Sequence, residues 1–347
     1  MTDVGTACPQ CAQPVAVEDA FCENCGAQLI ENAVAAPTEP SAEPTAAAST
    51  APCRDCGGVV ADDGFCSVCG KRAPSARDHW QEAPADWVGG VCDKGIVHAR
   101  NEDAMALAAS ADRTLAVLVV CDGVTSAPDS DRAALAAARI ACSTLTATPL
   151  PTNAGVAATV SHWSAAITRS CLEANAAAVG VARSLGNPSE PPSCTFIAAV
   201  LHGDIVTLGW CGDSRAYWLP DVGEPVQLML DHSLGTEMIQ GGMTQAEAEA
   251  DSTFHTITRW LGADSVDSTP DIASIQLEAA GWLLVCSDGL WNYASPAAAL
   301  KVLLDEQVAL GNTTPVPISD ALVRFANGRG GHDNITAALA RYEPSLR

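Results

Sequence analysis

The chain has 347 residues, which suits one large domain with something smaller beside it, and its 48% of hydrophobic residues exclude a wholly disordered protein. Its 18 Lys and Arg residues stand against 41 Asp and Glu residues, so the formal net charge is −23 at pH 7. Binding to nucleic acid or to an anionic membrane needs clustered cations, so this composition argues against both partners and suits a protein that binds divalent cations.

The first residues of the chain do not read as a targeting signal. Residues 1–10 lack the basic and apolar regions of a signal peptide. No apolar run approaches the ~18 residues that a membrane-spanning helix needs. We therefore expect a cytoplasmic protein, in whose reducing surroundings the 15 cysteines are metal ligands or core residues rather than disulfides.

Eight of these cysteines form a tandem repeat in which each copy has two CxxC pairs. The first copy, over residues 1–30, contains Cys8, Cys11, Cys22 and Cys25, and the second, over residues 53–70, contains Cys53, Cys56, Cys66 and Cys69. Two CxxC turns supply four thiolates for a closed tetrahedral site, and segments this short need the metal to fold. The pattern predicts two zinc ribbons with one structural Zn²⁺ each, with redox-active CxxC pairs as the alternative. The pair resembles the double zinc ribbons of many bacterial proteins.

Two linkers are expected around the second ribbon. Residues 31–52 are dominated by Pro, Ala, Thr and Glu, which predicts a disordered linker, and a shorter linker is expected over residues 71–86. Residues 1–86 hold four Lys and Arg against thirteen Asp and Glu, so the ribbons lack a cationic face for nucleic acid. We expect them to dock a protein partner, with a purely structural tether as the alternative.

The remaining residues, 87–347, read as one mixed domain. Strand-like runs rich in β-branched and apolar residues lie at 114–122, 194–203, 204–212, 282–289 and 334–342. Helices are expected at 129–146, along the apolar stripe from 156 to 178, and around 318–325. Two successive helices followed by adjacent strands predict a layered α+β domain rather than alternating βαβ units. Seven single cysteines in this region are expected to fill its core.

Acidic residues stand where several of these strands begin or end. They are Glu102, Asp103, Asp122, Asp213, Asp288 and Asp333. Strands that end together would bring these carboxylates to one edge of a sheet, where like charges cannot crowd without a compensating cation. Oxygen ligands suit Mg²⁺ or Mn²⁺, and two such ions can activate water and hold a phosphoryl group. An ordinary turn is the alternative for any single Asp-Gly pair.

The order of the motifs resembles that of the PPM-type (type 2C) metal-dependent Ser/Thr protein phosphatases. The matching blocks are GIVHARNEDAMAL (95–107), VVCDGVTSA (119–127), SCTF (193–196), WCGDSRAYWL (210–219), LDHS (230–233), ITRWLG (257–262), LLVCSDGLW (283–291) and GGHDNITAAL (330–339). The resemblance implies a four-layer sandwich of two antiparallel β-sheets flanked by helices, with metals in a cleft at one edge and the two small ribbons preceding it.

The resemblance also implies a role for each acidic residue. Asp122 would bridge two Mg²⁺ or Mn²⁺ ions, the Gly123 carbonyl would add a ligand, and Asp288 and Asp333 would complete the first metal's protein ligands. Asp213 would help to hold a third, weaker ion. Glu102 would hold metal-bound water, with Asp103 behind it, and a metal-bridging hydroxide would attack the phosphorus.

The phosphate-binding position departs from the family's pattern. His98 stands four residues before Glu102, where the family usually has Arg, and Arg100 lies two residues before it. Because an unperturbed His is charged only below pH ~6.5, phosphate binding is expected to depend on pH or to pass to Arg100. The family's DGxGG is DGVTS here, and this loop has no His to act as a general acid.

These observations predict a phosphatase that hydrolyses phosphoserine and phosphothreonine in proteins of a Ser/Thr kinase pathway, with the ribbons used for targeting or docking. The alternative is a catalytically weak pseudophosphatase that acts as an adaptor in such a pathway. A nucleic-acid binder conflicts with the charge.

Overall fold

The computed structural model of the protein describes residues 6–7, 14–15, 56–61, 64–151 and 155–344. Strands β1 (Thr6–Ala7) and β2 (Pro14–Val15) pair in antiparallel fashion inside the predicted first ribbon. The predicted linker over residues 31–52 lies outside the described residues. So do five of the predicted zinc ligands, namely Cys8, Cys11, Cys22, Cys25 and Cys53.

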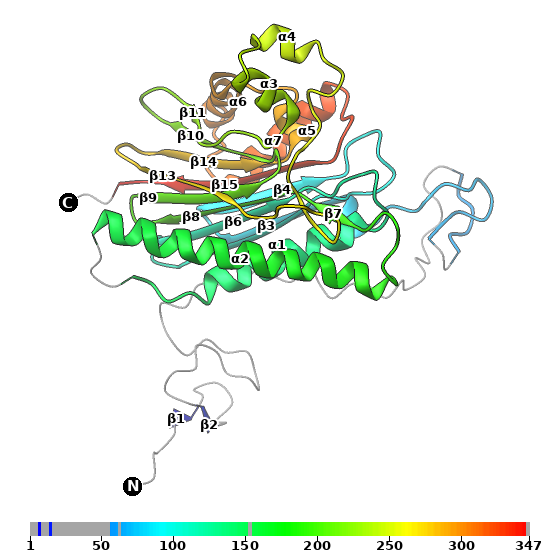
Figure 1. Ribbon diagram of the computed structural model, residues 1–347, viewed down its shortest axis with the longest axis horizontal. Helices are drawn as coiled ribbons and strands as arrows, with labels where there is room; N and C mark the ends of the chain where they lie inside the picture. The colour runs from blue at the N-terminus through cyan, green and yellow to red at the C-terminus, as the bar shows by residue number, and fades with distance from the viewer. Residues whose placement is uncertain (1–5, 8–13, 16–55, 62–63, 152–154, 345–347) are drawn as a thin grey trace.

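Two antiparallel sheets form the centre of the molecule (Figure 1). The first has the order β11-β10-β14-β15-β4-β3, with bounds β3 (His79–Ala85), β4 (Val88–Asp93), β10 (Arg215–Pro220), β11 (Val226–Gln227), β14 (Gly281–Cys286) and β15 (Ile335–Tyr342). The second has the order β13-β9-β8-β6-β5, with bounds β5 (Ala104–Ala109), β6 (Leu115–Cys121), β8 (Phe196–His202), β9 (Ile205–Cys211) and β13 (Asp271–Gln276). A short pair, β7 (Ser193–Cys194) and β12 (Leu261–Gly262), lies beside them.

Helices cover the outer face of each sheet. On the five-stranded sheet lie α1 (Ser130–Thr146) and α2 (Val156–Ser184), and on the six-stranded sheet lie α5 (Asp288–Trp291), α6 (Ala297–Ala309) and α7 (Pro315–Gly328). The helices α3 (Leu234–Gln240) and α4 (Gln245–Glu249) form a separate projection (Figure 1). The predicted four-layer α+β sandwich is confirmed.

Strand β6 shows why the sequence folds into these layers. All seven of its residues are buried. Because successive side chains point to opposite faces, Val117 and Val119 join the core beneath the helices, whereas Leu118 and Val120 join the core between the two sheets. A strand covered on both faces must be apolar throughout. The seven single cysteines are also buried, which confirms them as core residues: Cys92, Cys121, Cys142, Cys171, Cys194, Cys211 and Cys286.

The predicted linker over residues 71–86 was wrong for most of its length. A short 3₁₀ helix, η1 (Ala76–Asp78), leads into β3, which pairs with β4 at the edge of the six-stranded sheet. Only Glu82 within β3 is buried. An edge strand buries little and tolerates proline, here Pro84, so its composition resembled that of a loop.

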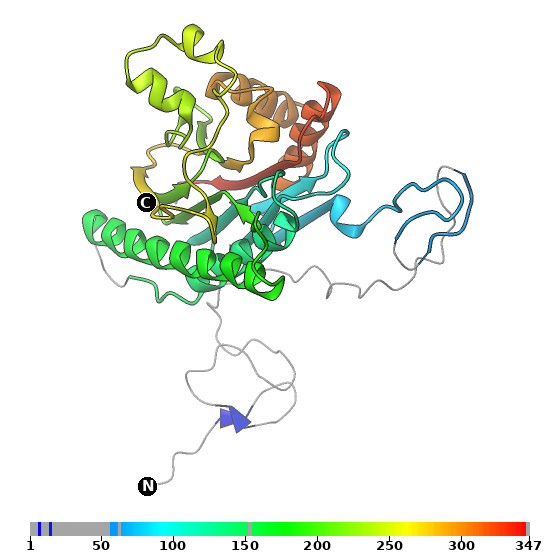
Figure 2. The same ribbon diagram turned by 45° about the vertical axis from the view of Figure 1, so that its right-hand side comes forward.

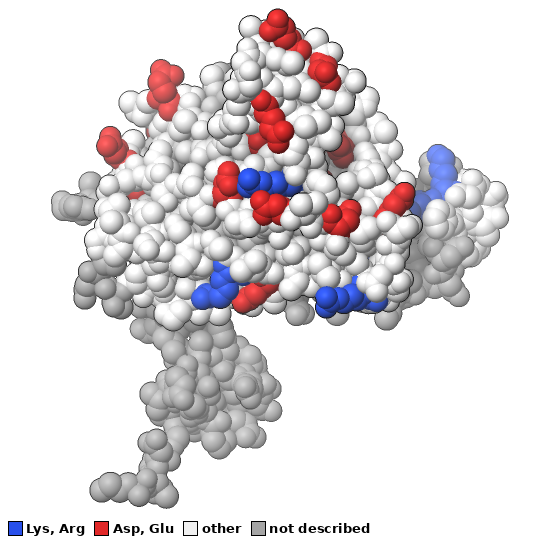
Figure 3. Space-filling model, in the orientation of Figure 1, with Lys and Arg blue, Asp and Glu red and all other residues white. Residues whose placement is uncertain are grey.

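The surface is acidic, as the composition requires. On the face shown in Figure 3, Asp and Glu are spread over the body and over the α3–α4 projection, while Lys and Arg occur as a few separate groups. Within the described ranges, no helix combines the length and the hydropathy that a membrane span needs.

Candidate functional site

Five carboxylates meet at one end of the two sheets. Asp103 precedes β5, Asp122 follows β6, Asp213 precedes β10, Asp288 begins α5 after β14, and Asp333 precedes β15. Burial raises the pKa of Asp122 well above its ordinary value, and repulsion from the other four carboxylates raises it further. The sequence places these residues up to 230 positions apart, so the charge cluster is a product of the fold.

The cluster has the chemistry of a site for divalent cations. Oδ1 of Asp103 and Oδ1 of Asp288 are buried and have no hydrogen-bond partner. The pKa of Asp288 is raised first by burial and then by repulsion from Asp213 and Asp333. Buried anionic oxygens that lack a cationic partner are unfavourable unless a metal neutralises them, and hard oxygen ligands fit Mg²⁺ or Mn²⁺.

The carboxylates are spread more widely than a single coordination shell. Among the described residues, only the thiols of Cys56, Cys66 and Cys69 form a group of three ligand atoms within 4.8 Å of one another. Like charges repel, and Mg²⁺ keeps several waters, so acidic side chains in such a site need not all reach the ion directly. The structure therefore brings the predicted acidic ligands to one edge of the sheets. It does not place three of their carboxylate oxygens within 4.8 Å of one another.

The turn after β6 is held by a threonine that the sequence analysis missed. Thr195 Oγ1 accepts a hydrogen bond from the Asp122 amide at 3.0 Å, and the Thr195 amide donates to the Asp122 carbonyl at 2.8 Å. A Cβ on Gly123 would lie 2.6 Å from the Glu102 carbonyl oxygen. Only glycine therefore lets the Asp122–Gly123 turn approach Glu102 this closely.

Asp103 is fixed from behind by two hydroxyls. Ser287 Oγ and Thr336 Oγ1 each donate to Asp103 Oδ2 at 2.7 Å. Burial raises the pKa of Asp103 to about 6, and the two hydroxyls oppose that shift. Ser287 directly precedes Asp288, so one residue links two members of the cluster. Neither hydroxyl stood out in the sequence, because isolated Ser and Thr residues occur everywhere.

Asn334 holds the loop that carries Glu102. Its Oδ1 accepts from the Glu102 amide at 2.7 Å, and its Nδ2 donates to the carbonyls of Lys94 and Arg100 at 2.7 and 2.9 Å. The neighbouring Asp333 is thereby joined to this loop through one side chain. All three hydrogen bonds depend on a side chain that both accepts and donates, which explains an Asn at this position.

The two candidate phosphate ligands lie beside the acidic cluster. His98 Nε2 is 3.4 Å from Asp333 Oδ1, and Arg100 Nη2 is 3.8 Å from Glu102 Oε1. The Arg100 side chain is 48% exposed, whereas that of His98 is 22% exposed. Burial raises the pKa of Glu102, and a hydrogen bond with Thr125 and the nearby Arg100 guanidinium oppose the shift. The more exposed guanidinium is the better placed to meet an incoming anion.

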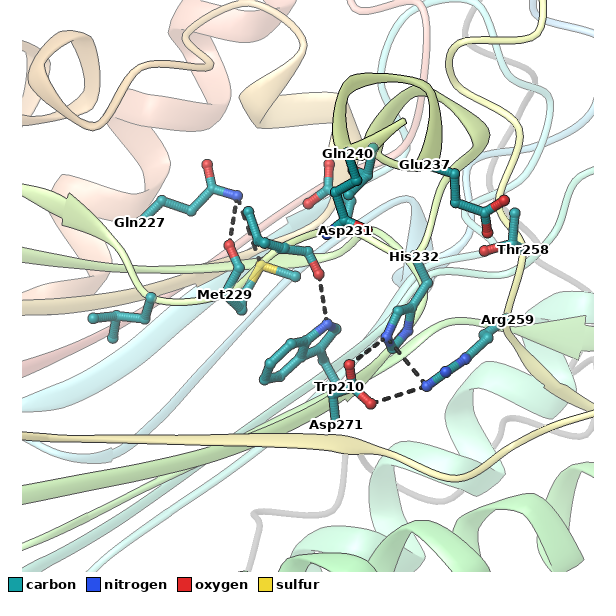
Figure 4. Close-up of a pocket in the computed structure, with 13 residues that line it drawn as sticks. Trp210, Gln227, Met229, Asp231, His232, Glu237, Gln240, Thr258, Arg259 and Asp271 are labelled. Atoms are coloured by element: carbon teal, nitrogen blue, oxygen red, sulfur yellow. Dashed lines mark hydrogen bonds and ion pairs between the residues drawn. The ribbon is translucent and has the colours of Figure 1, made fainter. Parts of the chain in front are cut away.

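A cavity of about 570 Å³ adjoins the turn that carries Asp213 (Figure 4). His232 Nδ1 accepts from the Gly212 amide at 3.3 Å, while its Nε2 lies 3.2 Å from Asp271 Oδ2. Figure 4 shows the imidazole between Trp210 and Arg259. Burial lowers the pKa of His232, so the ring is a neutral support for this turn. Burial also raises the pKa of Asp213, to about 7.

The second ribbon presents three of its four predicted ligands. Cys56 Sγ and Cys66 Sγ are 3.4 Å apart, and the amides of Gly58 and Val68 each donate to a cysteine sulfur at 3.4 Å. Hydrogen bonds from backbone amides, those of Cys69 and Val68 above all, lower the pKa of Cys66 to about 6. A thiol that is readily deprotonated suits zinc. Cys53, the fourth predicted ligand, lies outside the described residues.

Comparisons with known proteins point the same way. The family model described as "Protein phosphatase 2C" matches residues 96–325, and that described as "Double zinc ribbon" matches residues 8–70. Protein phosphatase PhpP of Streptococcus pneumoniae is 38% identical over 117 residues, which are 33% of this chain and 44% of PhpP. The chain thus spans less than half the length of this curated relative.

Solved structures share the architecture. The serine/threonine phosphatase of S. agalactiae has a TM-score of 0.58 and 27% identity, with coverage of 73% of this chain and 97% of that chain. The catalytic domain of the serine/threonine protein phosphatase PstP, in complex with two manganese ions, has a TM-score of 0.52 and 24% identity over 73% of this chain and 97% of that one. The second likeness concerns the fold alone.

Proposed function

The chain belongs to the protein phosphatase 2C family, and from that premise we propose that it is a metal-dependent phosphatase acting on phosphoserine and phosphothreonine in proteins. The observation that carries the proposal is the meeting of five carboxylates from both sheets at one edge. A fold that only needed stability would not gather mutually repelling acids, two of them buried, at one edge.

Asp122, Asp288 and Asp333, with the Gly123 carbonyl, would hold two Mn²⁺ or Mg²⁺ ions, and Asp213 would help to hold a third, weaker one. When bound, these ions supply the positive charge that activates water and offsets the charge of the phosphoryl group. PstP, which shares the fold, has been crystallised with two manganese ions. The unpartnered buried oxygens of Asp103 and Asp288 support the same assignment.

The residues of the chain itself would bind and orient the substrate. Arg100 would bind the phosphate, because its guanidinium is exposed and its fork of N–H donors matches the oxygens of a phosphate. His98, whose Nε2 lies 3.4 Å from Asp333 Oδ1, would stand beside it as a second polar group facing the phosphate. Glu102 would orient the attacking water, and Asp103 would accept hydrogen bonds that keep the site rigid.

The ribbons would each hold one structural Zn²⁺ and serve to target the enzyme or to dock a protein partner. Phosphoproteins of a Ser/Thr kinase pathway would be its substrates. The thiol cluster of Cys56, Cys66 and Cys69 supports the zinc assignment for the second ribbon.

The test uses purified full-length protein and phosphopeptides. We expect phosphate release from phosphoserine and phosphothreonine peptides only with Mn²⁺ or Mg²⁺, and a loss of at least roughly a thousandfold in Asp288→Asn. Asp305→Asn, an exposed change on α6, is the matched control and should keep full activity. Activity in chelator-treated protein, or an active Asp288→Asn variant, would contradict the metal assignment. An inactive but metal-binding wild type would favour the adaptor.

A further inference from the structure

Residues 72–78, here called the brace, join the second ribbon to the body (Figure 2). Their first part is bonded to the ribbon. Phe65 and Arg72 form an antiparallel bridge, the Cys66 amide donates to the Lys71 carbonyl at 2.7 Å, and the Ala73 amide donates to the Gly64 carbonyl at 2.7 Å. The turn that holds Cys66 and Cys69 therefore shares its backbone hydrogen bonds with the start of the brace.

The brace is ordered by its own side chains. The Ser75 hydroxyl accepts from the Arg77 amide, and Asp78 Oδ2 accepts from the Ser75 amide at 2.9 Å, which makes a capping box. Asp78 Oδ1 lies 3.1 Å from Arg72 Nη1. The Lys94 amide donates to the Asp78 carbonyl at 2.8 Å, so the far end is tied to the residue that follows β4. The segment is thus held at both ends.

The same segment holds the loop of residues 98–103, which carries His98, Arg100, Glu102 and Asp103. Arg72 Nη1 donates to the Ala99 carbonyl at 2.9 Å. Arg77 Nη2 donates to the Asp103 carbonyl at 2.7 Å. In return, Asn101 Nδ2 donates to the Arg77 carbonyl at 2.9 Å. Three hydrogen bonds therefore join the brace to a six-residue loop, and the two that the brace donates come from charged groups, which form the stronger bonds.

Arg77 also reaches the second loop of the site. Its Nη1 donates to the Asp131 carbonyl at 3.1 Å and lies 3.8 Å from Asp131 Oδ2, in the first turn of α1. Ser130 Oγ, one residue earlier, donates to the Val124 carbonyl at 2.9 Å, which follows the Asp122–Gly123 turn. One guanidinium thus links the 98–103 loop to the helix that supports Asp122. A planar, five-donor group suits this double contact, whereas an ammonium does not.

We infer that the brace couples the second ribbon to the active site, with Arg72 and Arg77 as positioning residues for the 98–103 loop. The ribbon is then more than a targeting module, because loss of order around Cys66 and Cys69 releases the first anchor of the brace. The effect on catalysis rests on the proposed function, but the effect on loop order does not.

The first experiment measures hydrogen exchange by mass spectrometry in full-length protein. In Arg77→Ala, we expect exchange in residues 98–103 and 122–131 to rise about tenfold, because two charge-assisted hydrogen bonds are lost. Arg77→Lys should recover part of the protection, since it keeps the charge but not the two-armed geometry. Arg324→Ala, an exposed change on α7, is the control and should alter neither segment. Unchanged exchange in Arg77→Ala would overturn the inference.

The second experiment tests the link to the ribbon. Cys66→Ser should raise exchange in residues 98–103, whereas Cys22→Ser, the corresponding change in the first repeat, should not. Arg72→Ala, which removes the hydrogen bond to the Ala99 carbonyl, should give a similar rise, and adding Cys66→Ser to it should add little. Equal effects of Cys66→Ser and Cys22→Ser, or strict additivity of Cys66→Ser and Arg72→Ala, would contradict the coupling.

Activity separates this inference from the proposed function. With p-nitrophenyl phosphate, the Mn²⁺ concentration for half-maximal activity should rise about tenfold in Arg77→Ala. If the wild type has no activity and the exchange changes still occur, the brace stands and the proposed function fails. If the wild type is active and Arg77→Ala leaves the exchange of the 98–103 loop unchanged, the inference about the brace is wrong and the proposed function stands. If Arg77 had a purely structural role, Arg77→Ala would lower the melting temperature without a rise in hydrogen exchange confined to residues 98–103 and 122–131.

Discussion

The thiol cluster of the second ribbon and the carboxylate cluster of the sandwich both gather anionic ligands, but they are built in opposite ways. Cys56, Cys66 and Cys69 lie close in the sequence, and backbone amides lower the pKa of Cys66 to about 6. The carboxylates come from distant strands, and burial raises the pKa of Asp122 and Asp288. In the local motif, backbone amides stabilise the charged form of a thiol ligand. At the sheet edge, packing brings carboxylates together and their negative charges are not balanced by the protein.

The largest difference between the two clusters is expected when metal is removed from both sites. A strong chelator should abolish phosphatase activity by at least roughly a thousandfold and should unfold the ribbon, because the ribbon has almost no apolar core. The sandwich should remain folded, because its three large clusters of buried apolar side chains need no metal. Hydrogen exchange in residues 64–73 and in β6, measured before and after chelation, checks both expectations. Simultaneous loss of protection in β6 would show that the carboxylate site also supports the fold.

A single methyl group tests the close approach at the carboxylate edge. In Gly123→Ala, the new Cβ would lie 2.6 Å from the Glu102 carbonyl oxygen and 3.0 Å from Glu102 Cβ, so the backbone must shift. We expect kcat/KM for p-nitrophenyl phosphate to fall about a hundredfold, because small displacements of catalytic groups are costly. Gly180→Ala, near the C-terminal end of α2, is the matched control, since nothing lies within 4 Å of its added Cβ. The control should keep its activity and gain about 1 kcal/mol of stability. Full activity in Gly123→Ala would show that the turn can move freely.

Glu82, which is not part of the carboxylate cluster, tests whether burial alone can raise the pKa of a carboxyl group. It is 4% exposed in β3, its Oε2 accepts from the Leu107 amide at 2.7 Å, and burial raises its pKa from 4.5 to about 8. Because the folded pKa lies above the unfolded one, its stabilising contribution is complete below pH ~4.5 and is lost as pH rises through about 8.

Urea unfolding checks this linkage. Between pH 5 and pH 9, the wild type should lose roughly 2–4 kcal/mol more stability than Glu82→Gln, which keeps the acceptor and cannot ionise. Glu224→Gln, on an exposed loop, should follow the wild type. Parallel pH profiles for the wild type and Glu82→Gln would show that Glu82 is not held in its neutral form.

Several parts of the molecule were predictable from local pattern. The run of apolar residues in 114–122 predicted β6, because a strand covered on both faces is apolar throughout. The stripe from 156 to 178 predicted α2, because a helix that buries one face has apolar residues every three or four positions. The edge strand β3 has no apolar pattern in its sequence, since only Glu82 of its residues is buried. Thr195, Ser287 and Thr336 were missed for a related reason. A hydroxyl becomes a support for Asp122 or Asp103 only when a remote strand brings it within hydrogen-bond distance.

The sequence by itself determined which chemical groups this protein has available: paired cysteines at the spacing of a ribbon, and carboxylates at the ends of apolar strands. Ligand type and spacing along the chain are covalent properties, so they can be read without a fold. Only the tertiary structure decided that five carboxylates from two sheets share one edge, and that Arg72 and Arg77 bind the loop beside them. These contacts join residues far apart in the chain, and their geometry follows from the packing of the whole domain.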